Sequence, residues 1–325
     1  MEEVFHPVDL QRLHEIADVV WGQNGPAPET VIDSAKEDVV AVIAAGWRYG
    51  PVQKFLRLCA ILEVSGRFPN VDLLDYDACF ARNLRVLSCA PSFGPGVAEM
   101  AFAMALAGAR DLIAGDAAMR VGSEKYYLVG NQNAFTLRKQ PVGFIGYGGI
   151  ARSLKPLLAP FECPISVYDP WLTDGFLQDQ GVRPVDLDTL LSESRVIFVL
   201  ATPTQSNQHM LDQEKLERIA PGALLVLISR AHVVDFDALT ALLQAGRFKA
   251  AIDVFPTEPV PRDHPIRHTP NTILSAHRAG IAGSGYQCIG RMVVNDLEAI
   301  LAGRVPQQMQ IAQPENIQGR GDVKV

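Results

Sequence analysis

Three side chains in the C-terminal half of the chain could together bind an anion and move a proton. Arg230, Glu258 and His277 each follow a short apolar run. A guanidinium binds a carboxylate through paired hydrogen bonds, and an imidazole donates or removes a proton near neutral pH. A carboxylate beside the imidazole orients it and stabilises its charged form. Taken alone, each residue has an ordinary structural explanation: a surface arginine, a loop glutamate, or a histidine whose hydrogen bonds are satisfied. Together they suggest acid–base chemistry on a small acid.

A glycine-rich turn supplies the second candidate site. The apolar run Pro141–Ile145 leads into Gly146-Tyr147-Gly148-Gly149-Ile150-Ala151, a G-x-G-x-x-A pattern before a predicted helix. In a dinucleotide-binding unit, such glycines allow a tight turn and let the backbone approach a pyrophosphate at the helix N-terminus. Asp169 ends the next predicted strand, 23 residues after Gly146 (169 − 146 = 23). This is close to the roughly 20 residues expected for the acid that binds the ribose.

The identity of the dinucleotide follows from the residues around Asp169. A carboxylate accepts hydrogen bonds from a ribose 2′-hydroxyl and repels a 2′-phosphate. Pro170 and Trp171 come next, without an adjacent Arg or Lys. The sequence therefore favours NAD over NADP. No cluster with metal-ligand spacing accompanies this pattern, and no metal is expected.

These motifs resemble those of the D-isomer-specific 2-hydroxyacid dehydrogenases, and the resemblance runs from Val39 to Gly303. The segments that carry it are Val97-Ala98-Glu99, the G-x-G-x-x-A turn, Ser229-Arg230, Asp253-Val254-Phe255-x-x-Glu258-Pro259, and His277 with Gly280. The resemblance implies NAD-dependent interconversion of a small D-2-hydroxy acid and its 2-keto acid. In such an enzyme the nicotinamide supplies the hydride, and the protein binds and orients the reactants.

The resemblance also assigns roles to individual residues. The matching Arg230, Glu258 and His277 would be catalytic: Arg230 would bind the substrate carboxylate, and His277 would act as acid and base with Glu258 as its partner. Ser65 and Gly66 follow a predicted strand of the N-terminal half, where the family binds the substrate carboxylate through backbone N–H groups. Arg48 follows another predicted strand, and its position alone makes it a candidate contact for the rest of the substrate, with a solvated loop charge as the alternative. The residues expected at the cofactor are Gly146, Gly148, Gly149, Ile150, Asp169, Thr202, Ile228, Asp253 and Gly280.

The elements that must position these residues form two α/β series. Strands are predicted at Val39–Ala44, Ala60–Val64 and Arg85–Ser88, and then at Pro141–Ile145, Ile165–Tyr168, Val196–Leu200, Ala223–Ile228, Lys249–Asp253 and Thr272–Ser275. Helices are predicted at Pro51–Cys59, Leu73–Ala81, Gly96–Ile113, Gly149–Pro160, Gln213–Ile219, Phe236–Ala245 and Gly283–Ala302. Alternating strands and helices indicate parallel sheets. The polar stretch Gly115–Gln140, which shows no clear period, is expected to cross between the domains.

Two doubly wound parallel-sheet domains are therefore expected. Residues 109–295 would form a Rossmann domain that binds NAD. Residues 1–108 and 296–325 would form a discontinuous, flavodoxin-like substrate domain, because the last helix is expected to pack back on the first series. This first unit would close over the substrate.

Composition limits the partners and the compartment. Of the 325 residues, 48% are hydrophobic and 20% are charged, which suits a globular chain, and the net charge of −7 argues against a nucleic-acid partner. The five scattered cysteines suggest a reducing compartment. The start of the chain lacks the pattern of a signal peptide, and no apolar run is long enough to span a membrane, so a cytoplasmic location is expected. The long apolar helix predicted over Gly96–Ile113 and the resemblance also suggest a homodimer.

Several alternatives and departures remain at this point. Formate dehydrogenases show a similar pattern but have Gln at the position of Glu258. The Glu in this sequence therefore argues against a formate dehydrogenase. Phosphite dehydrogenase and an NAD-sensing corepressor-like scaffold share these residues and stay open, as does the choice of 2-hydroxy acid. Ala276 and Ala231 stand where the family usually has Pro and Gly, and Arg138 replaces a common Gly. The first two could shift His277 and Arg230 and so affect efficiency.

Overall fold

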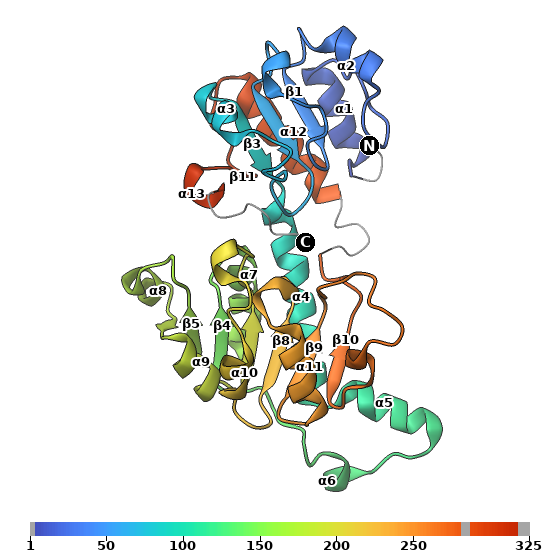
Figure 1. Ribbon diagram of the computed structural model, residues 1–325, viewed down its shortest axis with the longest axis vertical. Helices are drawn as coiled ribbons and strands as arrows, with labels where there is room; N and C mark the ends of the chain where they lie inside the picture. Colours follow the sequence, from blue (N-terminus) through green and yellow to red (C-terminus); the bar gives the residue numbers. More distant parts are fainter. Residues whose placement is uncertain (1–3, 281–286, 318–325) are drawn as a thin grey trace. The chain divides into compact units, whose positions relative to one another are not determined.

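A computed structural model describes residues 4–280 and 287–317, and Figure 1 shows the arrangement of its elements. The chain divides into two compact units. Unit 1 contains the described residues up to Gly96 and those from Gly280 onward, and unit 2 contains Val97–Ala279. Unit 1 is thus built from two separate stretches of the chain.

Unit 2 contains a parallel sheet whose strand order creates a ligand-binding edge. The sheet has seven strands in the order β10-β9-β8-β7-β4-β5-β6, and all neighbouring pairs are parallel. The chain enters the sheet at the interior strand β4, runs outward through β5 to the edge strand β6, and returns to β7 on the other side of β4. The strand order therefore reverses between β4 and β7, and ligands of open α/β sheets bind at the carboxyl ends of such strands. The strands are β4 Val142–Ile145, β5 Ile165–Tyr168, β6 Arg183–Pro184, β7 Val196–Val199, β8 Leu224–Leu227, β9 Lys249–Ile252 and β10 Thr272–Leu274.

The helices of unit 2 are α5 Leu112–Val121, α6 Tyr127–Gly130, α7 Gly149–Leu158, α8 Asp174–Asp179, α9 Leu187–Glu193, α10 Gln213–Glu217 and α11 Phe236–Gln244, with short 3₁₀ turns η2 Ala159–Phe161, η3 Gln205–Asn207, η4 Ala231–Val233 and η5 Pro265–His268. Helices α7 to α11 alternate with the strands of this sheet and bury apolar side chains, whereas α5 and α6 precede β4 and bury none. Four strands are completely buried: β4, β7, β8 and β9. This continuous burial is typical of parallel strands covered on both faces. The helix α4 Ala90–Ala109 spans the division between the units.

Unit 1 contains a smaller sheet with the order β1-β2-β3-β11. Strands β1 Ala41–Ala44, β2 Ala60–Glu63 and β3 Arg85–Ser88 are parallel, and β11 Gln310–Ile311 pairs antiparallel with β3. The helices are α1 Pro7–Ile16, α2 Glu29–Ala35, α3 Tyr76–Ala81, α12 Gln287–Leu301 and α13 Pro314–Ile317, with the 3₁₀ turn η1 Val52–Lys54.

Alternating residues of the unit 1 strands enter two different cores. Ile61 and Val86 pack with Trp47 and Phe55 on one face, whereas Leu62 packs against residues of α1 and α12 on the other. Side chains of a strand point alternately to opposite faces, so both faces of this sheet are buried. The predicted α/β class with parallel sheets is confirmed.

Element boundaries differ from the prediction where tertiary packing opposes local pattern. The predicted helix Pro51–Cys59 is wrong: only η1 forms, and Phe55 is already extended. The helix predicted over Gly96–Ile113 begins earlier, at Ala90, and ends at Ala109, after which the separate helix α5 occupies part of the stretch expected to be irregular. Helices α1 and α2 were not predicted.

The domain limits proposed from sequence, 108/109 and 295/296, fall inside helices α4 and α12. Contacts divide the chain earlier in both places, at Gly96 and at Gly280. Helix α12 lies wholly in unit 1, where it contacts α1 and β2. The last long helix therefore packs on the N-terminal α/β series, within unit 1.

Candidate functional site

The glycine turn follows β4 at the point where the strand order reverses. Gly146 has φ +94, and a Cβ there would lie 2.9 Å from the Cα of Ala201 after β7, so only glycine fits without backbone movement. Gly148 and Gly149 are exposed, with no atom within 4 Å of an added Cβ. Gly148 is also the N-cap of α7 and offers no side-chain cap. The turn thus leaves room for a ligand beside unpaired backbone N–H groups.

Asp169 closes this turn from the end of β5. Its Oδ2 accepts the N–H of Tyr147 at 2.8 Å, and its Oδ1 accepts the N–H of Trp171 at 2.9 Å. Each carboxylate oxygen has a second lone pair, so the half-buried group can still accept a bond from a ribose hydroxyl. These residues fit a dinucleotide: an open glycine turn, an uncapped helix start and a carboxylate at the neighbouring strand end.

His277 and Glu258 form a direct pair beyond β10 and β9. The Nδ1 of His277 lies 2.7 Å from the Oε2 of Glu258, and both side chains are a little over one third exposed. Glu258 is itself oriented, because its Oε1 accepts the N–H of Phe255 at 3.0 Å. A carboxylate can only accept, so Nδ1 carries the shared hydrogen and Nε2 remains for a reacting group. The predicted pairing of these two residues is therefore present.

Asp253 fixes the loop that carries His277. Asp253 is fully buried, and its two carboxylate oxygens accept the N–H groups of Arg278 and Ala279 at 2.9 and 3.0 Å. Its backbone oxygen accepts the N–H of His277 at 2.8 Å. His277 has φ +51, a conformation that non-glycine residues adopt rarely and at a cost. Three bonds to one residue hold it there. A contact of Asp253 with the cofactor stays a prediction.

Arg230 follows β8 at the same edge of the sheet. Its side chain is half-buried and donates from Nη1 to the carbonyl oxygen of Ser229 at 2.7 Å. The Oγ of Ser229 is buried and has no hydrogen-bond partner among the described residues. A buried hydroxyl without a partner costs free energy, which a bound polar group would recover. In the sequence, Ser229 is recognisable only as part of the motif around Arg230.

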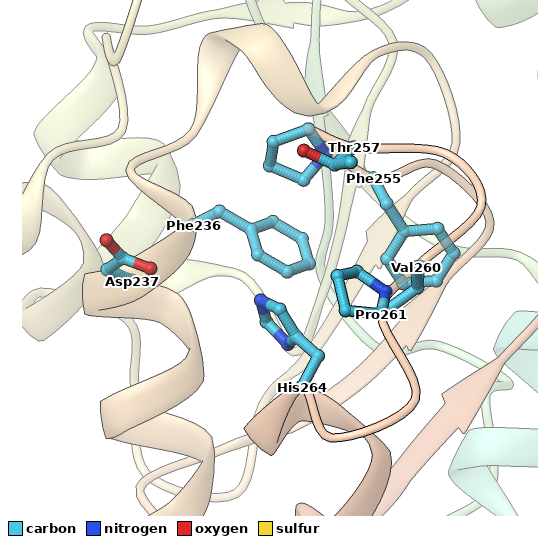
Figure 2. Close-up of a pocket in the computed structure, with 8 residues that line it drawn as sticks. Phe236, Asp237, Phe255, Thr257, Val260, Pro261 and His264 are labelled. Carbon is cyan, nitrogen blue, oxygen red and sulfur yellow. The ribbon is translucent and has the colours of Figure 1, made fainter.

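A cavity of about 190 Å³ is lined by residues on either side of Glu258 in its loop, among them Thr257 and Val260 (Figure 2). The rings of Phe255 and His264 each contact the ring of Phe236 on α11, with centroids 5.9 Å apart in both cases. Glu258 is not among the lining residues, and its carboxylate is bonded to His277 instead. This cavity therefore belongs to the packing that supports the loop, and the reacting groups lie elsewhere.

The predicted substrate residues lie in unit 1, on the loops after β1 and β2. Arg48 is exposed, and so is Gly66. The N–H of Ser65 is donated to the Oε1 of Glu63 at 3.2 Å, which leaves the N–H of Gly66 as the available donor of the pair. Sequence reasoning missed Glu63; the signal was a carboxylate within the apolar run Ala60–Val64.

The remaining predicted cofactor residues occupy strand ends or their loops. Thr202 is exposed after β7, Ile150 is half-buried in the first turn of α7, and Ile228 is buried after β8. Gly280 ends the described segment that carries His277. Their contacts with NAD stay predictions. Across the described residues, no helix is long and apolar enough to cross a membrane, and no group of three or more His, Cys, Asp or Glu side chains could hold a metal ion.

Comparison with known proteins gives a consistent result. Residues 102–279 match the sequence model of the D-isomer specific 2-hydroxyacid dehydrogenase NAD binding domain. The structure of a phosphoglycerate oxidoreductase from Rhizobium etli is 31% identical with a TM-score of 0.81, and the match covers 96% of this chain and 95% of that one. A glyoxylate reductase from Korarchaeum cryptofilum is 27% identical over 293 residues, 88% of this chain and 87% of its own. A D-3-phosphoglycerate dehydrogenase from Mycobacterium tuberculosis is 28% identical over 235 residues, 72% of this chain but 44% of its own length.

The matched domain model covers more than half of the chain, and it includes the glycine turn, Asp169 and the His277 pair. The geometry of that turn fits the dinucleotide named in the domain description. The chain therefore belongs to the D-isomer specific 2-hydroxyacid dehydrogenase family and is an NAD-dependent oxidoreductase.

Proposed function

We propose that the protein interconverts a small D-2-hydroxy acid and its 2-keto acid, with His277 as the acid and base and Arg230 as the carboxylate-binding group. The observation that carries this proposal is the 2.7 Å bond between His277 and Glu258, on a loop held by buried Asp253. An imidazole held by a carboxylate at one nitrogen keeps its other nitrogen available for proton transfer.

In the direction of reduction, Arg230 binds the substrate carboxylate and polarises the carbonyl group. When bound, NADH supplies the hydride. His277 donates its Nε2 proton to the carbonyl oxygen, and Glu258 stabilises the imidazolium before the transfer and orients the ring. In the direction of oxidation, His277 removes the hydroxyl proton. The Gly66 N–H and Arg48 are proposed substrate contacts, with Arg48 selecting among substrates.

The proposed substrates are 2-keto acids of the sizes named among the relatives, glyoxylate and the keto acid of 3-phosphoglycerate. The proposed cofactor preference is NADH over NADPH, because a 2′-phosphate would meet the carboxylate of Asp169. A reducing compartment such as the cytoplasm is proposed, since all five cysteines are free thiols. A homodimer is also proposed, formed through unit 2.

NADH oxidation with glyoxylate, hydroxypyruvate and 3-phosphohydroxypyruvate tests the proposal. We expect turnover with at least one of them, and a rate with NADPH at least tenfold lower at matched concentration. Arg230→Ala and His277→Ala should each lower kcat/KM by about 10²–10⁴-fold while the Kd for NADH changes little. Absence of turnover with all three acids, or full activity of His277→Ala, would contradict the proposed function.

A further inference from the structure

Unit 1 contains a carboxylate at a position where a charge is costly. Glu63 ends β2, between β1 and β3 in the sheet, and only 2% of it is exposed. Its neighbours on the strand, Ile61 and Leu62, pack into apolar cores on the two faces of the sheet, whereas Glu63 places a carboxyl group at the strand end. A buried carboxylate needs hydrogen-bond donors, and those at Glu63 come from the two loops on which the proposed substrate contacts lie.

Glu63 joins these two loops through their backbones. Its Oε2 accepts the N–H of Gly46 at 2.6 Å, and its Oε1 accepts the N–H of Ser65 at 3.2 Å. Gly46 has φ +86, a conformation that a side chain would strain. Gly46 lies two residues before Arg48, and Ser65 lies immediately before Gly66. One side chain thus fixes the backbone next to both proposed substrate contacts.

A third strand end extends the connection. The Oγ of Ser88, at the end of β3, donates to the carbonyl oxygen of Ser65 at 3.3 Å, and it also accepts the N–H of Ala90 at 3.2 Å. The ends of β1, β2 and β3 are therefore linked through Glu63 and Ser65. A set of bonds of this kind restricts the loops more than isolated contacts do.

We propose that Glu63 is a positioning residue for substrate binding: it holds the loops after β1 and β2 so that the Gly66 N–H and Arg48 are presented to the keto acid. This role rests on the proposed function. Glu63 acts through the two loops and leaves the cofactor turn of unit 2 untouched, so it governs KM for the keto acid and has little effect on NADH binding.

The test compares Glu63→Gln with a matched control in the same unit. Gln retains the size of Glu but presents an NH₂ donor to one of the two backbone N–H groups, so one loop loses its acceptor. Asp296 is equally buried, and its carboxylate accepts backbone N–H groups of Gln307, Gln308 and Met309, outside both loops. Asp296→Asn therefore removes the same kind of interaction elsewhere in unit 1.

We expect Glu63→Gln to raise KM for the keto acid roughly tenfold or more, as the loss of a bond to a charged group implies, with kcat changed less than threefold and the Kd for NADH unchanged. Asp296→Asn should leave KM within twofold of the parent value. Gly46→Ala strains the same loop without a steric contact within 4 Å, and should also raise KM. Amide hydrogen exchange should show faster exchange at Gly46 or Ser65 in Glu63→Gln.

An unchanged KM in folded Glu63→Gln overturns the positioning role, and so does an equal rise in Asp296→Asn, which would mean that unit 1 is loosened generally. If Glu63→Gln does not fold, an unchanged KM in Gly46→Ala has the same meaning. If the parent protein reduces no keto acid while NADH binds, the proposed function fails and the role of Glu63 fails with it. Turnover by the parent protein therefore distinguishes failure of the proposed function from failure of the positioning role of Glu63 alone.

Discussion

His277 combines an uncommon backbone conformation with a directed side chain. The left-handed φ of +51 costs on the order of 1 kcal/mol for a residue with a Cβ. The three hydrogen bonds to Asp253 over-determine the loop and keep this conformation occupied. The imidazole then reaches Glu258, which is in turn held by the Phe255 N–H. Every group that orients the histidine is thus fixed by a partner of its own.

Glu258→Gln tests the electrostatic part of this arrangement. Gln keeps the side-chain size and a hydrogen-bond acceptor but removes the negative charge that stabilises the imidazolium. Reduction needs the protonated ring, so the limb of the pH–rate profile that falls with rising pH should move to lower pH. The measurement is kcat/KM for keto-acid reduction across the pH range, with the parent as reference. A limb that stays in place would show that the two residues are not electrostatically coupled.

Glu63 should make the stability of the protein depend on pH. Burial raises the pKa of the Glu63 carboxyl above its ordinary value, and the bonds from Ser65 and Gly46 together with the charge of Arg67 oppose this only in part. As pH rises from about 4.3, the unfolded chain loses this proton before the folded chain does. The contribution of the protonated Glu63 side chain to the free energy of unfolding is therefore fully present below that pH. It is lost as pH rises through the raised pKa of the folded state.

Urea unfolding of the parent and of Glu63→Gln from acid to neutral pH measures this contribution. Gln has no proton to lose, so the stability of the parent relative to the variant should fall as pH rises. Burial raises the pKa of Cys89 to about 12, with the charge of Glu63 adding to the rise, so Cys89 stays neutral throughout. A constant difference between the two proteins across this range would mean that Glu63 has an ordinary pKa.

At the scale of elements, the reversal of strand order between β4 and β7 creates the cofactor site. Parallel pairing places Ile145 opposite Val199, so the turns after both strands lie side by side. The backbone of Gly146 therefore passes so close to Ala201 that a side chain at this position would not fit. The same edge of the sheet carries Arg230 after β8.

Gly146→Ala should weaken NADH binding by roughly tenfold or more. The new Cβ would lie 2.9 Å from backbone of Ala201, and alanine resists φ +94, so the turn must shift away from the position the dinucleotide needs. Fluorescence titration with NADH measures the Kd. Gly246→Ala is the control, because Gly246 also has positive φ (+68) but has no atom within 4 Å of an added Cβ. It should cost stability alone; an equal loss of NADH affinity would contradict the explanation.

At the scale of the whole molecule, unit 2 carries a group of exposed apolar side chains on one segment. Figure 1 shows α5 and α6 projecting from the seven-stranded sheet. Exposed apolar side chains gather on this segment: Leu112, Ile113, Met119, Val121, Tyr126, Tyr127, Leu128 and Val129, each more than half exposed. Contiguous exposed apolar residues of this kind mark interaction surfaces. They support the proposed homodimer through unit 2.

Leu128→Asp should weaken that dimer. Leu128 is 80% exposed, so the change costs the isolated fold little, but it places a charge in an apolar interface. We expect the parent to sediment as a dimer at micromolar concentration and the variant to dissociate at concentrations at least tenfold higher than the parent does. Leu56→Asp, at a 66% exposed site in unit 1, should leave the mass unchanged. A parent that is monomeric at micromolar concentration would rule out the dimer.

The sequence by itself determined the fold class and the family, and it predicted the main polar residues of the site. The reason is that these features are local: glycines within one turn, an acid one strand later, and polar residues directly after apolar runs. The limits of β4, β5 and β7 were predicted to within one residue for the same reason. Motif residues are required by chemistry or by a tight turn, and a single chain segment reveals them.

Only the tertiary structure decided which groups meet. Glu63 and Gly46, and Asp253 and Arg278, are far apart in sequence and are joined because parallel pairing brings their strand ends to one edge. The role of Ser65 changed for the same reason, since its N–H is already donated to Glu63. The helix predicted from local pattern over Pro51–Cys59 also does not form. The backbone is already extended at Phe55, whose ring packs beside Trp47. Burial and partners are properties of the folded chain, and no spacing along the sequence contains them.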